Sequence, residues 1–431
     1  MTYNQALEFI DARVPAFHLQ GIKAYKADLG NIVQLLNFLE NPQKRLKTIH
    51  VAGTNGKGST SHMLTSILIS AGYKTGLYTS PHLVSLRERI RVDGQMISEE
   101  KLVAFVELVE EQIDVVQPSF FELMTAMSFW SFAEEKCDIS VIETGLGGRL
   151  DATNILIPEL SVITNIGLDH TDLLGDTLPL IAFEKAGIIK LSIPVIIGEK
   201  QVETEDVFRK VAQQREAPLQ FADEQLRVDS LSIQLNNKRL VNIKRQNKDW
   251  LNALELDLIG EYQLKNILTV LAVIEQLNVS GWAISEEAIR AGLKNSMLLS
   301  GLNGRWQTIS TQPHVVCDTA HNAHGLSYVA KQAHAIGGKL HLILGMVADK
   351  NVEEAILALP ESATYYFTQA STPRAMPFAE LLAKAARLNR HGFAFLSVKE
   401  AFEAAKTNAK DNDLILITGS NFLVGDFLAQ E

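Results

Sequence analysis

The strongest chemical signal in the sequence is a glycine-rich segment between an apolar run and a helical pattern, Gly53-Thr54-Asn55-Gly56-Lys57-Gly58-Ser59-Thr60. Consecutive backbone N–H groups in such a turn form a concave anion site, and the N-terminus of the following helix adds positive potential. Lys57 could reach the outer phosphates of a nucleotide, and the hydroxyl of Ser59 or Thr60 could reach a phosphate or Mg²⁺. A glycine turn with a solvated lysine is the alternative, but the strand–loop–helix context favours phosphate binding.

Two later positions carry side chains that suit a metal ion. Glu143 ends the apolar run 139–142, and a carboxylate at the carboxyl end of a parallel strand beside a phosphate loop could bind Mg²⁺. His170 follows another apolar run, and its ring could be a metal ligand that Asp169 orients. A lone histidine is more often structural or exposed, so spacing alone leaves this role open.

Lys185 lies in the segment Phe183-Glu184-Lys185-Ala186-Gly187-Ile188-Ile189. Apolar surroundings disfavour the charged form of an amine, so its neutral form becomes more available. Such a lysine could act as a nucleophile, or it could take up CO₂ and become an anionic carbamate. A surface lysine on a helix is the alternative, and periodicity does not decide between them.

The second half of the chain holds another set of polar residues at the ends of apolar runs. Asp318 and His321 follow the run 315–317 and could bind a ribose and a phosphate, while Arg305 offers a planar fork for phosphate. Residues 346–350 and Gly419-Ser420 also end such runs, at the edge where α/β sheets bind ligands.

The elements that must position these residues alternate between apolar runs and helical patterns, which predicts parallel sheets covered by helices. In the first half we expect strands at 48–52, 138–143, 160–165 and 193–197, and helices at 5–13, 29–39, 59–71, 101–115, 122–134 and 262–277. Residues 227–235 and 239–243 alternate around Asn236-Asn237 and predict a hairpin. A second series of strands is expected at 315–317, 340–344, 364–367, 393–396 and 414–417.

Composition excludes several classes of protein. The 431 residues carry 40 Lys and Arg against 50 Asp and Glu, a net charge of −10, with no run of five or more basic residues, so a nucleic-acid-binding surface is not expected. No apolar run approaches the ~18 residues of a membrane span, and the first residues lack a signal-peptide pattern. Cys137 and Cys317 share no metal-type spacing and fit a reducing compartment. We therefore predict a cytoplasmic protein.

Taken together, these segments resemble bacterial folylpolyglutamate synthase/dihydrofolate synthase, the folate branch of the Mur ligase superfamily. The resemblance runs from about Gly21 to Gly425 with its motifs in order, at 53–60, 78–83, 87–90, 120–122, 143–154, 168–171, 184–188, 304–306 and 318–322. It implies an α/β fold with two domains. The first, 1–297, would be a P-loop-type ATPase domain whose parallel sheet carries a small antiparallel addition. The second, 298–431, would be a smaller Rossmann-like domain.

The resemblance also implies a reaction. ATP would phosphorylate a substrate carboxylate, the amine of L-glutamate would attack the acyl phosphate, and ADP and phosphate would be released. The acceptor would be dihydropteroate, a folate, or both. Partners would be these small molecules alone, the enzyme would be a monomer, and closure of the two domains would exclude water from the acyl phosphate.

Site residues follow from the same resemblance. Catalytic roles would fall to Lys57, His170, Lys185 and His321. The segment 53–60 would bind ATP together with Asn266, Arg305, Asp318 and His321. Ser80 and Glu143 would hold a first Mg²⁺, while His170 and a carbamylated Lys185 would hold a second. The substrate contacts would come from Phe121, which stacks on a pterin, from Asp151, which accepts hydrogen bonds from the pterin amino groups, from His82, and from Ser420 beside the glutamate.

Two alternatives stay open. A Mur-type cell-wall ligase would carry a UDP-binding domain before the phosphate loop, and 52 residues precede Gly53 in this sequence. A nucleotide-binding module without ligase chemistry would have no use for the Lys185 segment or for a second α/β domain.

Overall fold

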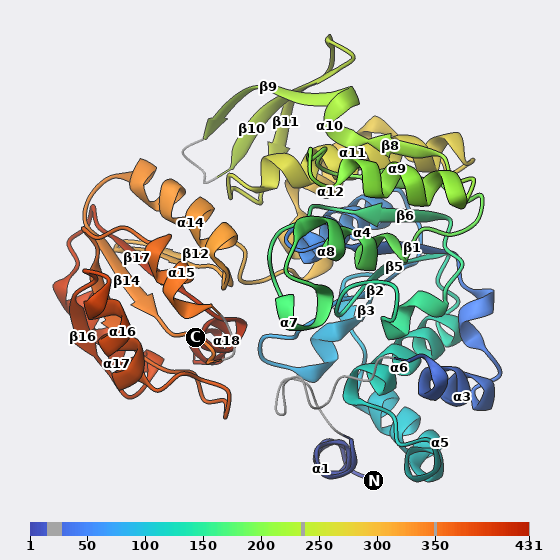
Figure 1. Cartoon of the computed structure of the whole chain (residues 1–431), viewed down its shortest axis with the longest axis horizontal. Helices are drawn as coiled ribbons and strands as arrows, with labels where there is room; N and C mark the ends of the chain where they lie inside the picture. Colours follow the sequence, from blue (N-terminus) through green and yellow to red (C-terminus); the bar gives the residue numbers. More distant parts are fainter. Residues whose placement is uncertain (15–27, 234–237, 349–350, 431) are drawn as a thin grey trace. The chain divides into compact units, whose positions relative to one another are not determined.

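The computed structural model describes residues 1–14, 28–233, 238–348 and 351–430 (Figure 1). Contacts divide the chain into two compact units. The first comprises Met1–Pro81 and Arg87–Leu302, and the second comprises His82–Leu86 and Asn303–Glu431. Each unit has its own sheets and its own apolar core.

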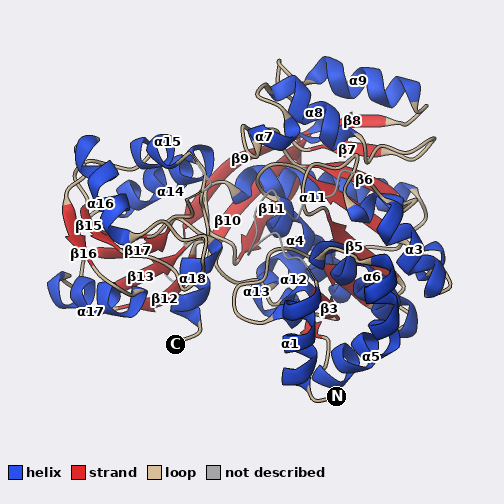
Figure 2. Ribbon diagram, turned by 60° about the horizontal axis from the view of Figure 1, so that its bottom comes forward, coloured by secondary structure: helices blue, strands red, loops and turns tan. Residues whose placement is uncertain are grey.

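An eight-stranded sheet organises the first unit, in the order β4-β3-β2-β5-β1-β6-β7-β8. Figure 2 shows its strands β5, β6, β7 and β8 in red among blue helices. From β2 to β8 all neighbours are parallel, whereas β3 and β4 add an antiparallel edge. The central strands are buried along their whole length, as expected where helices cover both faces. The strands are β1 (Thr48–Ala52), β2 (Thr75–Tyr78), β3 (Ile90–Val92), β4 (Gln95–Met96), β5 (Ile139–Glu143), β6 (Leu160–Ile163), β7 (Val195–Ile197) and β8 (Leu219–Phe221).

Two helical layers cover the faces of this sheet. Ile49 and Val51 of β1 lie in one apolar core with α4 and α11, while Ala52 lies in a second core with α8 and α9. Successive strand residues point to opposite faces, so β1 contributes to both cores. The helices of this unit are α1 (Tyr3–Arg13), α3 (Gly30–Phe38), α4 (Lys57–Ser70), α5 (Glu99–Val116), α6 (Phe120–Glu134), α7 (Thr171–Leu174), α8 (Leu178–Ala186), α9 (Glu205–Gln214), α10 (Ala222–Gln225), α11 (Gln263–Val279), α12 (Glu286–Lys294) and α13 (Ser296–Ser300), with 3₁₀ turns η2 (Pro42–Arg45), η3 (Leu86–Arg89) and η4 (Ala152–Ile155).

The antiparallel addition is a three-stranded sheet of β9 (Leu226–Ile233), β10 (Arg239–Arg245) and β11 (Lys248–Leu256), with β10 in the middle. Val241 and Leu254 of this sheet pack into the core that holds α11 and α12. The predicted hairpin of β9 and β10 is confirmed, and its Asn236-Asn237 turn lies outside the described residues. Strand β11 was not predicted.

The second unit is built on a six-stranded sheet in the order β12-β13-β17-β14-β15-β16. All neighbours are parallel except β12, which runs antiparallel to β13 at one edge. The strands are β12 (Gln307–Thr311), β13 (His314–Cys317), β14 (Leu340–Leu344), β15 (Thr364–Phe367), β16 (Gly392–Ala394) and β17 (Leu414–Thr418), and the helices are α14 (Ala323–Ile336), α15 (Val352–Leu357), α16 (Phe378–Arg387), α17 (Val398–Asn408) and α18 (Asn421–Leu428).

The predicted fold class is therefore confirmed: a parallel-dominated sheet with an antiparallel addition, followed by a second α/β unit. The antiparallel edge strands β3, β4 and β12 were not predicted, because they are short or only partly buried and carry little apolar signal. Within the part of the chain that the structure describes, no helix has the length and apolarity that crossing a membrane requires.

Candidate active site

The glycine-rich segment leaves the end of β1 and enters α4, which begins at Lys57. Gly56 has φ +85°, and a Cβ at that position would lie 2.3 Å from Oδ1 of Asn266, so the turn requires glycine here. The ammonium of Lys57 folds back over the loop and donates to the carbonyl oxygens of Gly53 at 3.1 Å and Thr54 at 3.3 Å. The loop thus holds a cation at the start of a helix, an arrangement that fits phosphate.

The segment after β6 braces this loop from the side. Thr54 N–H donates to the carbonyl of Asn165 at 2.9 Å, and Asn55 N–H donates to Oδ1 of the same residue at 3.0 Å. The hydroxyl of Thr164 donates to the Asn55 carbonyl at 2.6 Å. Thr164 and Asn165 were not predicted as site residues. Their only signal was a position at the end of a strand predicted to lie in the same sheet as β1.

A second brace comes from the first turns of α11. Nδ2 of Asn266 donates to Oε1 of Gln263 at 2.8 Å, and Nε2 of Gln263 donates to the Ser59 hydroxyl oxygen at 3.0 Å. Gln263 and Ser59 are buried. The hydroxyl of Thr60 is also buried and has no hydrogen-bond partner among the described residues. The structure thus brings the predicted residue Asn266 to the loop, through a glutamine that was not predicted.

Ser80 follows β2, and Glu143 is the last residue of the neighbouring parallel strand β5, so both lie at the same edge of the sheet. The Ser80 N–H donates to Oε2 of Glu143 at 3.3 Å, and Glu143 is only 4% exposed. The two predicted magnesium ligands therefore lie together. A carboxylate and a hydroxyl supply the oxygen donors that Mg²⁺ prefers, so this pair fits the metal chemically.

Lys185 lies in the last turn of α8 and is buried. Its ammonium donates to the Gly53 carbonyl at 2.8 Å, the same oxygen that Lys57 contacts. Burial, and to a smaller extent the nearby charge of Lys57, lower the pKa of Lys185 from 10.5 to about 7, although Asp169 and Asp151 act in the opposite direction. The buried amine therefore lies against the phosphate loop and is easily deprotonated.

The glycine-rich segment after Glu143 fixes the end of α8 that carries Lys185. Arg149 N–H donates to the Glu184 carbonyl at 2.8 Å, and its guanidinium pairs with the Glu184 carboxylate at 2.9 Å. A Cβ at Gly148 would lie 2.9 Å from the carbonyl oxygens of both Glu184 and Lys185. The absence of a side chain at Gly148 lets the two segments pack directly.

His170 is the N-cap residue of α7 and has a left-handed backbone with φ +50°. Its backbone N–H donates to Oδ1 of Asp169 at 2.9 Å. The distance from that oxygen to Nε2 of the His170 ring is 3.9 Å, which is beyond hydrogen-bond range. Asp169 therefore binds the backbone of His170 at closer range than the ring that it was predicted to orient.

Phe121 and Asp151 both lie next to Gly145. The Phe121 ring lies 5.8 Å from the Tyr78 ring, centroid to centroid, and a Cβ at Gly145 would be 2.6 Å from Phe121. The buried Asp151 carboxylate accepts four hydrogen bonds, from the N–H groups of Gly145, Leu146 and Thr153 and from the Thr153 hydroxyl. Burial raises the pKa of Asp151, and these hydrogen bonds oppose that shift. Binding a pterin amino group as well would require the carboxylate to share or exchange one of these bonds.

In the second unit, Asp318 and His321 follow β13, Ser420 follows β17, and Arg305 precedes β12. Asp318 accepts the N–H groups of Trp306 and Ala320, each at 2.8 Å, and Nδ1 of His321 lies 3.0 Å from the Thr319 carbonyl. The partly buried Arg305 contacts the Gly304 carbonyl through Nη1 at 3.3 Å. Ser420 caps α18 by accepting the Leu423 N–H at 3.1 Å. His82 is partly buried in the short segment that belongs to this unit.

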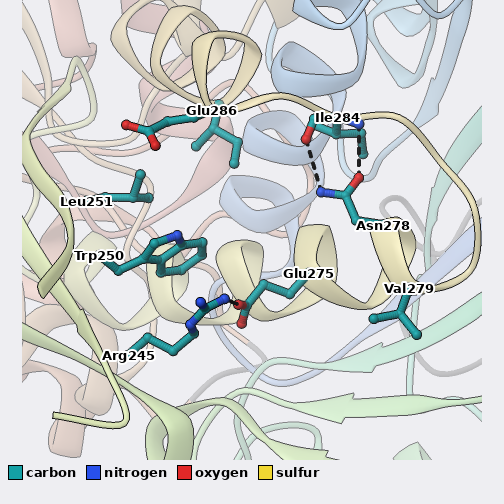
Figure 3. Close-up of a pocket in the computed structure, with 9 residues that line it drawn as sticks. Arg245, Trp250, Leu251, Glu275, Asn278, Val279, Ile284 and Glu286 are labelled. Atoms are coloured by element: carbon teal, nitrogen blue, oxygen red, sulfur yellow. Dashed lines mark hydrogen bonds and ion pairs between the residues drawn. The ribbon is translucent and has the colours of Figure 1, made fainter. Parts of the chain in front are cut away.

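A cavity of about 460 Å³ lies elsewhere in the first unit, between β10, β11 and the carboxyl end of α11 (Figure 3). Arg245 pairs with Glu275 beside the Trp250 ring, and Asn278 exchanges two hydrogen bonds with the backbone of Ile284. None of the predicted site residues lines this cavity, so it is separate from the candidate active site.

Comparison with known proteins identifies two family domains. The Mur ligase middle domain matches residues 51–274, and the glutamate ligase domain of Mur ligases matches residues 304–421. Dihydrofolate synthase/folylpolyglutamate synthase from Bacillus subtilis is 34% identical over 418 residues, with 93% of this chain and 94% of that protein covered. Its counterpart from Escherichia coli is 35% identical, with 86% and 83% covered. The chain belongs to the folylpolyglutamate synthase/dihydrofolate synthase family.

Solved members of the folylpolyglutamate synthase/dihydrofolate synthase family share the fold over the whole chain. E. coli FolC in complex with DHPP and ADP has a TM-score of 0.87 and 32% identity, covering 100% of this chain and 97% of that one. Folylpolyglutamate synthase from Mycobacterium tuberculosis, complexed with ADP and AMPPCP, has a TM-score of 0.89 and 29% identity, covering 99% and 98%. The resemblance inferred from the motifs is therefore confirmed at the level of family and fold.

Proposed function

We propose that this chain is an ATP-dependent ligase that joins L-glutamate to the carboxylate of dihydropteroate, of folates, or of both. The observation that carries the proposal is the buried amine of Lys185 held on the carbonyl of Gly53, inside a phosphate loop with its own lysine, in a member of this family. A nucleotide-binding module has no need of a second, buried lysine at that position.

The nucleotide is proposed to lie with its phosphates over the segment 53–60. Lys57 can exchange its contacts with loop carbonyls for phosphate oxygens, because its ammonium already lies at the start of α4. Asn266 contacts the loop from α11, and the relatives solved with ADP, AMPPCP, or AMPPNP and a Mn ion support a nucleotide there. Arg305, Asp318 and His321 of the second unit remain predicted nucleotide contacts.

Ser80 and Glu143 are the residues proposed to hold Mg²⁺. Among the described residues, no group of three or more His, Cys, Asp and Glu side chains is placed to hold a metal ion. The proposed site therefore depends on one carboxylate, one hydroxyl and the oxygens of the nucleotide itself. When bound, Mg²⁺ would neutralise phosphate charge during the transfer.

Lys185 is proposed to act as a carbamate. A neutral amine adds to CO₂ and loses a proton, and the product is an anionic oxygen donor. Burial favours the neutral amine, and the last turn of α8 holds the nitrogen beside the loop. His170 and this carbamate are proposed to be the two protein ligands of a second Mg²⁺.

The reaction itself has two steps. The acceptor carboxylate attacks the γ-phosphorus, the bond from that phosphorus to the bridging oxygen breaks, and ADP leaves with the bonding electrons. The neutral amine of L-glutamate then attacks the acyl carbon, an amide forms, phosphate leaves, and the amine proton passes to solvent. Lys57 would stabilise the charge on the transferred group.

The acceptor and glutamate contacts are proposed from the family motifs. Phe121 and Asp151 would bind the pterin in the domain 1–297, whereas Ser420 in the domain 298–431 and His82 would contact the remaining substrate groups.

The test is phosphate release by the purified chain with ATP, Mg²⁺, dihydropteroate and L-glutamate. We expect release that depends on both co-substrates, and mass spectrometry of products with dihydropteroate and then tetrahydrofolate will identify the acceptor. Release that ignores the acceptor and glutamate would refute the ligase.

A further inference from the structure

His50 is a buried polar residue that the proposed reaction does not use. It lies in the middle of β1, with 0% exposure, between Ile142 of β5 and Ser161 of β6. Burial, and to a smaller extent the charge of Lys190, lower its pKa from 6.5 to about 3, so the ring is neutral. A buried imidazole in a central strand needs a hydrogen-bond partner.

That partner is Thr153, which in turn contacts Asp151. Nε2 of His50 lies 2.8 Å from the Thr153 hydroxyl oxygen, and this hydroxyl donates to Oδ1 of Asp151. Because the only hydroxyl proton of Thr153 goes to Asp151, Nε2 of His50 must carry the proton that completes the first bond. Nδ1 then has no proton, and it has no hydrogen-bond partner among the described residues.

The chain of donors therefore runs in one direction, from His50 through Thr153 to the Asp151 carboxylate. Oδ1 of Asp151 also accepts the Thr153 N–H at 3.0 Å, while Oδ2 accepts the N–H groups of Gly145 and Leu146, each at 2.9 Å. Every donor supports the ionised carboxylate, and together they fix its plane.

The fixed carboxylate in turn positions the loop after Glu143, which lies beside Phe121. Asp151 closes the loop that follows Glu143 by holding its Gly145 and Leu146 N–H groups. Gly145 lies directly against the Phe121 ring. A small rotation of Asp151 would therefore move the loop at the place proposed to bind the pterin.

From this arrangement we infer that His50 and Thr153 are positioning residues for the acceptor site, holding Asp151 and the Gly145 turn in the geometry that receives the pterin. The inference rests on the proposed function. The inference gives the buried residues His50 and Thr153 a role that they perform through Asp151, without contacting the substrate themselves.

The test compares Thr153→Val, which keeps the shape and removes the hydroxyl, with Thr153→Ser, which restores it. We expect Thr153→Val to raise KM for the acceptor about tenfold, since a hydrogen bond to a charged group is lost, with KM for ATP unchanged. Thr153→Ser should behave as wild type.

A second pair of variants changes His50, the first donor of this hydrogen-bonded series, in case Thr153→Val does not fold. His50→Gln can still donate an N–H to the Thr153 oxygen, whereas His50→Leu cannot, so only the second should raise KM for the acceptor. In the Thr153→Val background, His50→Leu should raise KM for the acceptor little further, because both changes break the same series of hydrogen bonds.

Three results would overturn the inference: an unchanged acceptor KM in both Thr153→Val and His50→Leu, an equal rise in KM for ATP, or a Thr153→Ser enzyme as impaired as Thr153→Val. Failure of the proposed function is distinguishable, because wild type itself would then show no acceptor-dependent ADP formation.

Discussion

Asp257 offers a test of the electrostatics of the first unit. It follows β11, and Oδ2 of its carboxylate accepts the Met297 N–H at 2.8 Å. Oδ1 is buried and has no hydrogen-bond partner among the described residues. Burial raises the pKa of this carboxyl from 3.8 to about 6, and the hydrogen bonds to backbone N–H groups only partly offset the shift. The ionised carboxylate is therefore unfavourable in the folded protein.

The substitution Asp257→Asn removes the charge and keeps an oxygen for the Met297 N–H. In wild type, the cost of ionisation is fully present above the folded pKa, shrinks as the pH falls, and is absent below the unfolded pKa. The free energy of unfolding of the variant minus that of wild type should therefore increase by about 1.4 kcal/mol between about pH 5 and about pH 8. The pH-dependent part of this difference in the free energy of unfolding reports the charge of Asp257 alone, because a change in packing would be the same at both pH values.

Urea unfolding at the two pH values measures this difference, followed by the fluorescence of the first-unit residues Trp130, Trp250 and Trp282. Asp249→Asn, near the start of β11, is the matched control. The Asp249 side chain is 67% exposed, so this substitution removes a carboxylate that is not buried. An Asp257→Asn difference that is equal at both pH values would refute the reasoning that burial penalises this charge.

Substitutions at three further positions test the phosphate loop and its neighbours. Gly56→Ala should weaken ADP binding at least about tenfold in calorimetry, because a left-handed alanine costs about 1–2 kcal/mol and its Cβ would meet an amide oxygen at 2.3 Å; Gly72→Ala, with φ +88° but open space, should leave ADP affinity unchanged. Lys185→Ala and Lys185→Arg should each lower phosphate release about a hundredfold with ADP binding largely kept, since neither side chain forms a carbamate. Normal turnover in either variant would exclude the carbamate. Gln263→Leu should raise KM for ATP about tenfold by removing the N–H that holds the Ser59 hydroxyl, and an unaltered KM would contradict that role.

Local patterns predicted the parts of the molecule whose signal lies in consecutive residues. The loop at 53–60 and the strand before it follow from glycine spacing and an apolar run, and the structure has both. The predicted strand at 393–396 is shorter and shifted in the structure, at Gly392–Ala394. Element boundaries depend on hydrogen bonds to neighbouring strands, which apolar runs do not encode.

Strand β11 shows why periodicity fails where register shifts. Its pairing with β10 is irregular between Val241 and Ile243, and Ala253 has φ +50°. Asn242 accepts the Ala253 N–H through its side chain at that point. A bulge interrupts the alternation of apolar and polar residues, so the segment 248–256 did not indicate a strand.

Site residues that act through long-range contacts were also beyond sequence reasoning. Gln263 lies 204 positions from Ser59, and His50 lies 103 positions from Thr153. Neither pair has a characteristic spacing, because the fold alone brings the partners together. Lys57 was predicted from its own glycine-rich segment and Lys185 from the family resemblance, and the structure places both amines on the Gly53 carbonyl.

The carbonyl oxygen of Gly53 receives both Lys57 and Lys185, and this shared acceptor couples the two amines energetically. The charge of Lys57 lowers the pKa of Lys185, so a substitution at Lys57 changes the proton affinity of Lys185. The effects of single variants at the two lysines will therefore not sum, and only the double variant can apportion them.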